Sequence, residues 1–256
     1  MLPLLNKQRL RIYLRPQQLT IARVVGWWRV GVQEKQVLTA ADKGWGTLVN
    51  MLDEWLHQHP PASMEVVLSA HFTRLFLLPW DAALSSDANR LALAQGLFNH
   101  RFAPDRATDF RFQLDSPVYG RSQCGVAVEQ ALVTALREVA ARHQLRLRAL
   151  VPLVALVWNR FQRQLGAGGN LLVVEGDRVV NITYREKHIS SLSLRPFSRA
   201  DDLQLDLPGV TGNVALFAPG LAVPAGERTK TLLLRDGEGF APLVDAEHAY
   251  ALCGVY

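Results

Sequence analysis

The sequence lacks most of the features that would place the chain outside the class of ordinary globular proteins. It has only two cysteines, Cys124 and Cys253, in 256 residues, a length that can bury a sizeable core. A disulfide framework is therefore not required, and we interpret both residues as reduced, buried thiols that pack like small hydrophobic side chains. Charged residues make up 20% and hydrophobic residues 49% of the chain, a balance that excludes a disordered protein.

Long apolar runs are also absent. The longest apolar stretch, residues 145–156, is interrupted by Arg146, Arg148 and Pro152, so it falls short of the roughly 20 residues that a membrane-spanning helix needs. Near the N-terminus, Lys7 and Arg9 follow the leucines, whereas a secretory signal places positive charge before its apolar segment. We therefore expect a cytoplasmic protein that does not cross a membrane by itself.

Positive charge is in excess, but it is not concentrated. The net charge is +5 and the isoelectric point is near 9.5, yet the 28 lysines and arginines are spread along the chain. Basic and aromatic residues do not alternate as they do on a platform for single-stranded nucleic acid. We therefore expect no nucleic-acid partner. The alternative is a basic module that binds DNA or anionic lipid, and the net charge is the only feature that supports it.

The motifs of the common catalytic and metal sites are missing. The seven histidines are scattered without the short ligand spacing of zinc or iron sites. The chain has no Gly-x-Ser-x-Gly turn and no Gly-x-x-x-x-Gly-Lys-Ser/Thr loop. The segment that contains Asp201, Asp202 and Asp206 has the composition of a solvated surface segment. The alternative is that two of these carboxyl groups act as a paired acid and base. The sequence predicts no catalytic residue, no cofactor and no metal.

The order of predicted elements indicates an α/β protein with two related halves, each of which opens with a three-stranded antiparallel meander. In the first half we predict helices over residues 43–57, 86–102, 129–143 and 153–165, and strands over residues 9–15, 19–25, 28–37, 65–70, 72–80, 108–114, 124–128 and 145–151. In the second half we predict strands over residues 171–175, 178–184, 189–194, 214–217 and 231–234. The glycine-rich segment 166–169 is the best domain boundary, so the lobes are predicted as 1–165 and 166–256.

Three stretches of the sequence resemble the PilM and GspL family of actin-like proteins from type IV pilus and type II secretion machines. The first runs from Val66 to Trp80 and contains a Leu-Pro pair before a capped helix; the second, residues 127–165, contains Trp158-Asn159; and the third is the alanine-rich segment 249–254. The resemblance implies a two-lobed actin-like fold, of the ribonuclease H-like class, with a small α+β subdomain inserted in the first lobe at about residues 70–125.

The same resemblance implies that nucleotide binding has been lost. Nucleotide-binding members carry an Asp-x-Gly signature in the first hairpin, where the carboxylate orders a metal and the glycine lets backbone N–H groups approach phosphate. In this sequence Tyr13 stands at the aspartate position and Arg15 at the glycine position. In the second lobe Glu175 and Gly176 stand at the corresponding place, without a phosphate loop after them, so a plain hairpin turn is expected there.

The resemblance also implies partners. We expect a non-catalytic scaffold, peripheral to the inner membrane, that binds the cytoplasmic tail of a PilN-like membrane protein, an assembly ATPase, or both; rings or dimers are left open. The adjacent Trp27 and Trp28 are candidates for part of such a surface, because large aromatic side chains supply contact area at low entropic cost. The alternative is an active, ATP-binding relative of the actin-like ATPases and sugar kinases.

Overall fold

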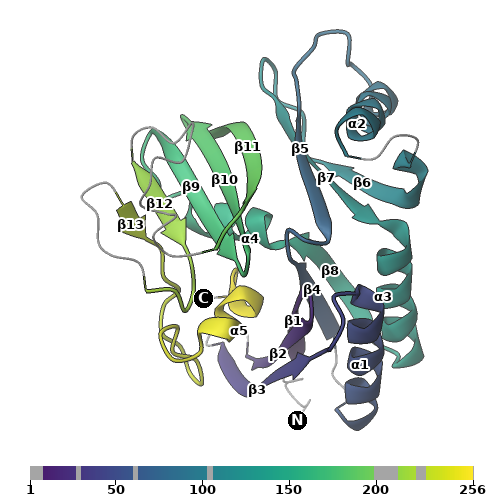
Figure 1. Ribbon diagram of the computed structural model, residues 1–256, viewed down its shortest axis with the longest axis vertical. Coiled ribbons are helices and arrows are strands. Elements are labelled where there is room, and N and C mark those ends of the chain that lie inside the picture. The colour runs from purple at the N-terminus through teal and green to yellow at the C-terminus, as the bar shows by residue number, and fades with distance from the viewer. Residues whose placement is uncertain are drawn as a thin grey trace, which may run out of the picture. The chain divides into compact units, whose positions relative to one another are not determined.

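The structure is a computed structural model that describes residues 8–26, 30–59, 63–102, 106–198, 213–222 and 229–255. The chain forms two compact units (Figure 1). The first unit comprises Met1–His71, Leu132–Arg160 and Leu233–Tyr256, and the second comprises Phe72–Ala131 and Phe161–Leu232. Within the described ranges no helix has the length and apolar character needed to span a membrane.

A five-stranded sheet with the order β3-β2-β1-β4-β8 is the centre of the first unit (Figure 1). Its strands are β1 (Arg9–Arg15), β2 (Gln18–Val25), β3 (Gly31–Thr39), β4 (Ser63–Leu68) and β8 (Arg146–Pro152). The first three strands are antiparallel, whereas β4 and β8 add in parallel to β1 and to β4. The meander predicted at the start of the chain is therefore confirmed, with the third strand displaced toward residue 39.

Helices cover both faces of this sheet. Leu10 of β1 pairs with Arg23 of β2, and Arg23 lies over the Trp55 ring of α1 (Trp45–Gln58), at 5.8 Å from the ring centroid. Directly opposed residues share a face, and successive residues alternate between faces. The other face of β1 meets α5 (Ala246–Leu252), because the Tyr13 ring stacks on that of Tyr250.

The remaining helices of the first unit follow the predicted pattern. Helix α1 lies within one residue of the predicted range 43–57 at its C-terminal end, and its buried side chains recur at three- and four-residue spacing: Leu48, Val49, Leu52, Trp55 and Leu56. Helix α3 (Gln130–Arg142) begins in the second unit and has most of its length in the first. It leads into β8, which is followed by the apolar helix α4 (Leu153–Phe161).

Within the second unit, a three-stranded sheet and one helix confirm the predicted small α+β subdomain. The sheet has the order β5-β7-β6, with β5 (Thr73–Leu78), β6 (Phe110–Leu114) and β7 (Gln123–Glu129), and a short 3-10 helix, η1 (Ala107–Asp109), precedes β6. Helix α2 (Asp87–Arg101) starts at Ser86, whose hydroxyl accepts a hydrogen bond from the Asn89 N–H at 3.1 Å. The apolar core between helix and sheet includes Phe76, Phe98 and Ala127.

The second five-stranded sheet repeats the topology of the first, with the order β11-β10-β9-β12-β13 (Figure 1). Its strands are β9 (Gly168–Glu175), β10 (Arg178–Arg185), β11 (His188–Pro196), β12 (Val214–Phe217) and β13 (Thr229–Thr231). Strands β9 to β11 are antiparallel, and β12 and β13 add in parallel. The prediction of two related halves is confirmed, but the last strand ends at Thr231 and does not extend to residue 234.

The glycine-rich segment at 166–169, which was predicted as a domain boundary, contains the start of a strand. Gly168 and Gly169 are the first residues of β9, and a Cβ at Gly169, which has φ +152, would lie 2.4 Å from the carbonyl oxygen of Asn213. Glycine is required there because another backbone passes close to the strand. Residues 233–256 belong to the first compact unit. The lobe boundary predicted at 165/166 divides the chain differently from these two compact units, and it stays a prediction.

Candidate functional site

The hairpin of β1 and β2 carries the first pair of predicted site positions. Its turn is two residues long, because Arg15 pairs directly with Gln18. Pro16 occupies the first central position, and Gln17 adopts φ 63 at the second, which is the arrangement of a type II turn. Glycine favours that second position, so Gln17 accepts a modest strain in a tight connection.

Tyr13 lies in the core of the first unit. Only 1% of its surface is exposed, and its ring stacks on that of Tyr250 in α5, with ring centroids 5.0 Å apart and planes inclined by 16°. An aromatic pair of this kind adds to the stability that burial alone supplies. The position that the family resemblance assigns to a metal-ordering aspartate is thus filled by a ring packed against a helix, and it offers no carboxylate.

Two arginines flank Tyr13 on the same face of β1, and both bind residues near the C-terminus. Arg15 forms an ion pair with Glu247 of α5 at 3.3 Å. Arg11 is 7% exposed, forms an ion pair with Glu65 of β4, and donates hydrogen bonds to the carbonyl oxygens of Ala251 at 3.0 Å and Cys253 at 2.7 Å. The C-terminal helix is therefore attached along the strand that carries the signature positions.

The second pair of predicted positions lies at the hairpin of β9 and β10. Glu175 pairs in register with Arg178, so Gly176 and Asp177 form a two-residue turn. Gly176 has φ +61 and no atom lies within 4 Å of the position that a Cβ would take. Only the first central residue has positive φ, which is typical of a type II′ hairpin turn. Glu175 is 2% exposed, so its carboxylate belongs to the interior of the second unit.

Two other sets of predicted residues lie outside the part of the chain that the structure describes. Trp27 and Trp28, the predicted partner-binding residues, lie outside the described residues. The acidic residues Asp201, Asp202 and Asp206 also lie outside them. The predictions about these positions stay predictions.

The cysteines are unpaired thiols. Cys253 is fully buried and Cys124 partly buried, and both are free. Burial raises the pKa of each thiol to about 12, so neither carries the thiolate that nucleophilic catalysis or metal binding requires at neutral pH.

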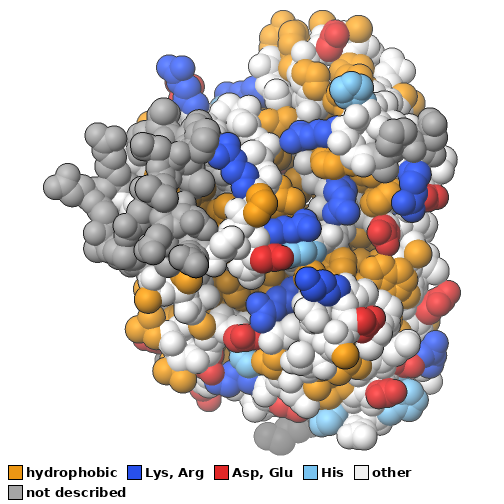
Figure 2. Space-filling model, in the orientation of Figure 1, with side chains coloured by type: hydrophobic (Ala, Val, Ile, Leu, Met, Phe, Trp, Pro, Cys, Tyr) orange, Lys and Arg blue, Asp and Glu red, His pale blue; other side chains and the backbone are white. Residues whose placement is uncertain are grey.

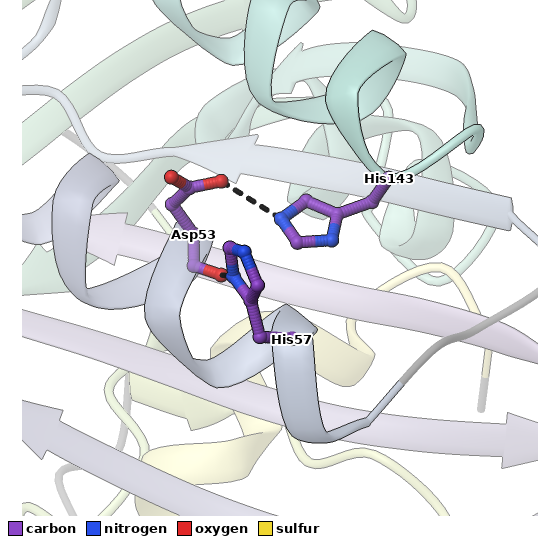
Figure 3. Close-up of side chains that lie close together, drawn as sticks. All are labelled: Asp53, His57 and His143. Atoms are coloured by element: carbon purple, nitrogen blue, oxygen red, sulfur yellow. Dashed lines mark hydrogen bonds and ion pairs between the residues drawn. The ribbon is translucent and has the colours of Figure 1, made fainter.

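Among the residues that the structure describes, one cluster of potential metal ligands was not predicted from the sequence: Asp53, His57 and His143 (Figure 3). Asp53 and His57 are four residues apart on α1, and His143 directly follows α3. Nε2 of His143 lies 2.8 Å from Oδ1 of Asp53, and Arg142 forms an ion pair with Oδ2 of the same carboxylate. The spacing of Asp53 and His57 was the available sequence signal, whereas nothing local indicated His143.

Electrostatics at Asp53 favour the ionised carboxylate. Burial alone would raise the pKa of Asp53, but the hydrogen bond with His143 and the charge of Arg142 outweigh burial and lower the pKa below its ordinary value of 3.8. The Asp53 side chain is 18% exposed and that of His143 is 10% exposed, so the cluster lies at the edge of the core.

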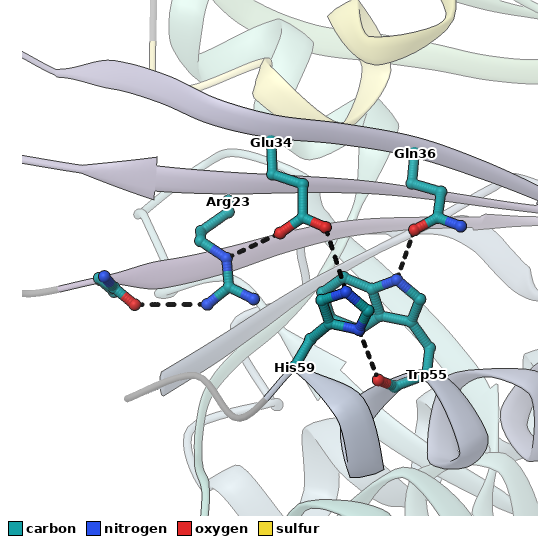
Figure 4. A network of polar contacts seen from close by, with 6 residues as sticks. Arg23, Glu34, Gln36, Trp55 and His59 are labelled. Atoms are coloured by element: carbon teal, nitrogen blue, oxygen red, sulfur yellow. Dashed lines mark hydrogen bonds and ion pairs between the residues drawn. The ribbon is translucent and has the colours of Figure 1, made fainter.

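A second polar network joins α1 to the edge of the first sheet (Figure 4). Trp55 donates its indole N–H to Oε1 of Gln36 at 2.5 Å, and the ring of His59 stacks on that of Trp55 with centroids 4.3 Å apart. Arg23 donates to Glu34 at 2.9 Å, and Nε2 of His59 lies 3.6 Å from the other oxygen of Glu34. Each charged group has a partner of opposite charge or an aromatic ring beside it, so this network fixes α1 on the sheet.

The face in Figure 2 carries no single field of positive charge among the described residues. Lysine and arginine side chains lie there singly or in small groups, with hydrophobic and acidic side chains between them. This arrangement agrees with the even distribution of basic residues along the chain, and it gives the alternative of a basic binding module no support on this face.

Comparison with solved structures identifies the fold. The chain is similar to the cytoplasmic domain of EpsL, an inner membrane component of the type II secretion system of Vibrio cholerae, with a TM-score of 0.57 and 14% identity over 96% of this chain and 94% of that one. It is similar to a Bacteroides thetaiotaomicron protein with an actin-like ATPase fold and unknown function, with a TM-score of 0.58 and 12% identity over 85% and 83% of the two chains.

A third similarity is to a chain of the PilM–PilN type IV pilus biogenesis complex, with a TM-score of 0.52 and 12% identity over 78% of this chain and 66% of that one. No protein-family model matches the sequence, and no curated protein matches it either. At these identities the comparisons establish the architecture alone. The chain has an actin-like fold of the kind found in the cytoplasmic domain of EpsL and in the PilM–PilN complex, as its sequence predicted.

Proposed function

We propose that this protein is a non-catalytic, actin-like scaffold in the inner-membrane assembly platform of a type II secretion system or a type IV pilus. The observation that carries the proposal is the packing of Tyr13 against Tyr250 at the position where a nucleotide-binding relative would carry an aspartate. A buried aromatic pair cannot order a divalent metal and its water beside phosphate.

The neighbouring positions support the same conclusion. Arg15 stands where a nucleotide-binding relative would carry a glycine, and its side chain pairs with Glu247. A side chain at this position keeps phosphate away from the backbone N–H groups. Arg11 ties the C-terminal segment to the same strand through two carbonyl oxygens. A nucleotide could enter this face only if the stacked ring pair separated. The surface ion pair and the hydrogen bonds of the buried arginine would also have to break.

The proposed partners follow from the nature of the similar proteins. EpsL is an inner membrane component of a secretion system, and PilM is found in a complex with PilN. We infer that this chain binds the cytoplasmic tail of a PilN-like membrane protein, the assembly ATPase of the same apparatus, or both, and that it reaches the inner membrane through them. A scaffold needs surface complementarity and no assembled chemistry.

Calorimetric titration with ATP and Mg²⁺ tests the non-catalytic part of the proposal. We expect no saturable heat for the wild-type chain. Binding with a Kd of about 1 µM, which corresponds to about −8 kcal/mol, would contradict it.

Crosslinking in the source cells, followed by affinity capture and mass spectrometry, tests the scaffold part. We expect a pilus or secretion membrane protein, or its assembly ATPase, among the crosslinked partners. A matched capture from cells in which the same chain carries no affinity tag separates specific partners from background. Recovery of neither kind of partner in replicate captures would count against the scaffold.

The alternative of an ATP-binding ATPase or kinase relative has one observation in its favour. The second hairpin retains a carboxylate at Glu175 and a glycine at Gly176, the two residue types that a phosphate site uses. Their geometry favours a plain turn, because the two strands pair directly on either side of Gly176 and Asp177. The ATP titration distinguishes the two functions.

A further inference from the structure

The cluster of Asp53, His57 and His143 belongs to no part of the proposed scaffold function. One ligand atom from each residue can be chosen so that all three atoms lie within 4.8 Å of one another. Asp53 and His57 lie on one face of α1 because residues four apart are neighbours on a helix. Figure 3 shows the His57 and His143 rings beside Asp53, and their centroids are 4.6 Å apart with the planes nearly perpendicular, at 89°.

The hydrogen bonding of His57 prepares one of its nitrogens for a metal. Nδ1 of His57 lies 2.8 Å from the backbone carbonyl oxygen of Asp53. A carbonyl oxygen only accepts, so Nδ1 carries the proton and, in the neutral ring, Nε2 carries the lone pair. Metal-binding histidines commonly donate their other N–H to a carbonyl or carboxylate in this way, which fixes the tautomer and the ring orientation.

The two remaining ligands already converge on one point. Nε2 of His143 and Oδ1 of Asp53 are 2.8 Å apart and share one proton, and a cation could replace that proton with little movement. The ion pair between Arg142 and Oδ2 leaves Oδ1 as the ligand atom and orients the carboxylate. The Arg142 side chain is 55% exposed, so its positive charge can turn toward water and is screened there.

We propose that Asp53, His57 and His143 bind one Zn²⁺ ion that joins α1 to the end of α3. Two imidazole nitrogens and one carboxylate oxygen suit zinc, which takes four ligands and would complete its shell with water. Softer copper(I) sites favour sulfur, and calcium and magnesium favour oxygen alone, so the mixed nitrogen and oxygen set selects against them. Because all three residues belong to the first unit, bound zinc would stabilise that unit.

Calorimetric titration of the untagged, full-length chain with zinc chloride, after treatment with a chelator, is the primary test. We expect one zinc ion per chain and an upward shift of the thermal midpoint on addition of zinc, since a ligand that binds only the folded state stabilises it. Competition from the cysteines is not expected, because burial raises the pKa of both thiols to about 12 and the thiolate is the zinc ligand.

Two histidines in equivalent positions supply the matched variants. His57 is the second-last residue of α1 and His100 the second-last residue of α2, and both are exposed. We expect His57→Gln to weaken zinc binding by at least about tenfold and His100→Gln to leave it unchanged. The circular dichroism spectra of both variants should match that of the wild type, which shows that a loss of binding is not a loss of folding.

A third variant addresses the ligand on the other helix. His143→Gln keeps a group that can donate to Asp53 and should also weaken zinc binding by at least about tenfold. Absence of saturable binding to the wild type would overturn the proposal. Binding that survives unchanged in His57→Gln would also overturn it, because the ion would then lie elsewhere. Neither result would affect the proposed scaffold function, which uses none of these residues.

Discussion

Each five-stranded sheet begins with a hairpin, and the two hairpins share a topology. They differ in the residue types at the predicted phosphate-site positions and in the contacts that those residues make. Both consist of antiparallel strands joined by a two-residue turn. In the hairpin of β1 and β2, Tyr13 is buried against Tyr250, and Arg11 and Arg15 bind the C-terminal segment. In the hairpin of β9 and β10, Glu175 and Gly176 keep the residue types that a phosphate site uses. The two hairpins therefore differ in residue type at the predicted positions, although both connect their strands by a plain two-residue turn.

The first hairpin shows that a position predicted to belong to a degenerate phosphate site can be part of the core. The face of β1 that carries Arg11, Tyr13 and Arg15 contacts α5 and the residue after it, more than 200 positions later in the chain. Such long-range contacts stabilise the first unit, whereas a tight turn such as that at Gly176 contributes mainly local backbone geometry. Substitutions in the two hairpins should therefore differ in cost.

Restoring the signature carboxylate should have the largest effect. We expect Tyr13→Asp to lower the free energy of unfolding by about 5 kcal/mol, because it removes a buried ring and places a carboxylate in an apolar site. It should not create ATP binding. Urea denaturation measures the first expectation and calorimetry the second.

The matched control for that substitution is Tyr13→Phe, which retains the ring and its stacking. We expect a cost below about 1.5 kcal/mol, since the change in shape is small. If Tyr13→Asp were as stable as Tyr13→Phe, the side chain would not be packed as described and the contrast between the hairpins would fail.

The attachment of the C-terminal segment should have the next largest effect. Arg11→Leu leaves Glu65 and two carbonyl oxygens without their donor, and we expect a loss of about 3 kcal/mol. The control is Arg15→Leu, which removes an ion pair whose side chains are 26% and 51% exposed and should cost less than about 1 kcal/mol. Equal midpoints for the two variants in urea denaturation would show that Arg11 does not hold the C-terminal segment.

Much of this architecture could be predicted from local patterns. Alternation over residues 9–15 and the β-branched, apolar run over residues 19–25 predicted the first hairpin, and the spacing of Leu48, Leu52 and Trp55 predicted α1. The Ser86 cap was also predictable, since serine before a helix satisfies its free N–H groups. These features depend on neighbours in sequence, which is why one sequence sufficed.

The features that could not be predicted depend on contacts between residues that are far apart in the sequence. Nothing near Tyr13 indicates that its ring meets Tyr250, and nothing near Asp53 indicates that His143 reaches it from the end of another helix. Gly169 was predicted to lie at a domain boundary because its local sequence is glycine-rich, whereas the structure requires glycine there because the backbone of Asn213 passes close to the strand. Tertiary contacts decide all three.

In the second hairpin we expect a smaller cost from a change in the turn. Gly176→Ala should lower the free energy of unfolding by about 1 kcal/mol, because alanine at φ +61 is strained while the space around its Cβ is open. The control is Gly166→Ala, which also has open space and has no positive φ, and which should leave stability unchanged or slightly improved. A loss at Gly176 as large as that at Tyr13 would remove the distinction between the two hairpins.

The smallest effect concerns pH and the helix that covers the first hairpin. Burial lowers the pKa of His248 in α5 below its ordinary value of 6.5, against the opposing influence of Asp245. A histidine with a lowered folded-state pKa binds protons more readily in the unfolded chain. Its contribution to stability is present above pH 6.5 and is lost as the pH falls through the folded-state pKa.

Because His248 is partly exposed, we expect its share of this loss to be below about 1 kcal/mol. The measurement compares urea midpoints at about pH 8 and about pH 5 for the wild type and for His248→Gln, which cannot titrate in that range. The wild type should lose more stability than the variant on acidification. If His248→Gln lost as much stability as the wild type on acidification, titrating groups other than His248 would have to cause the acid sensitivity.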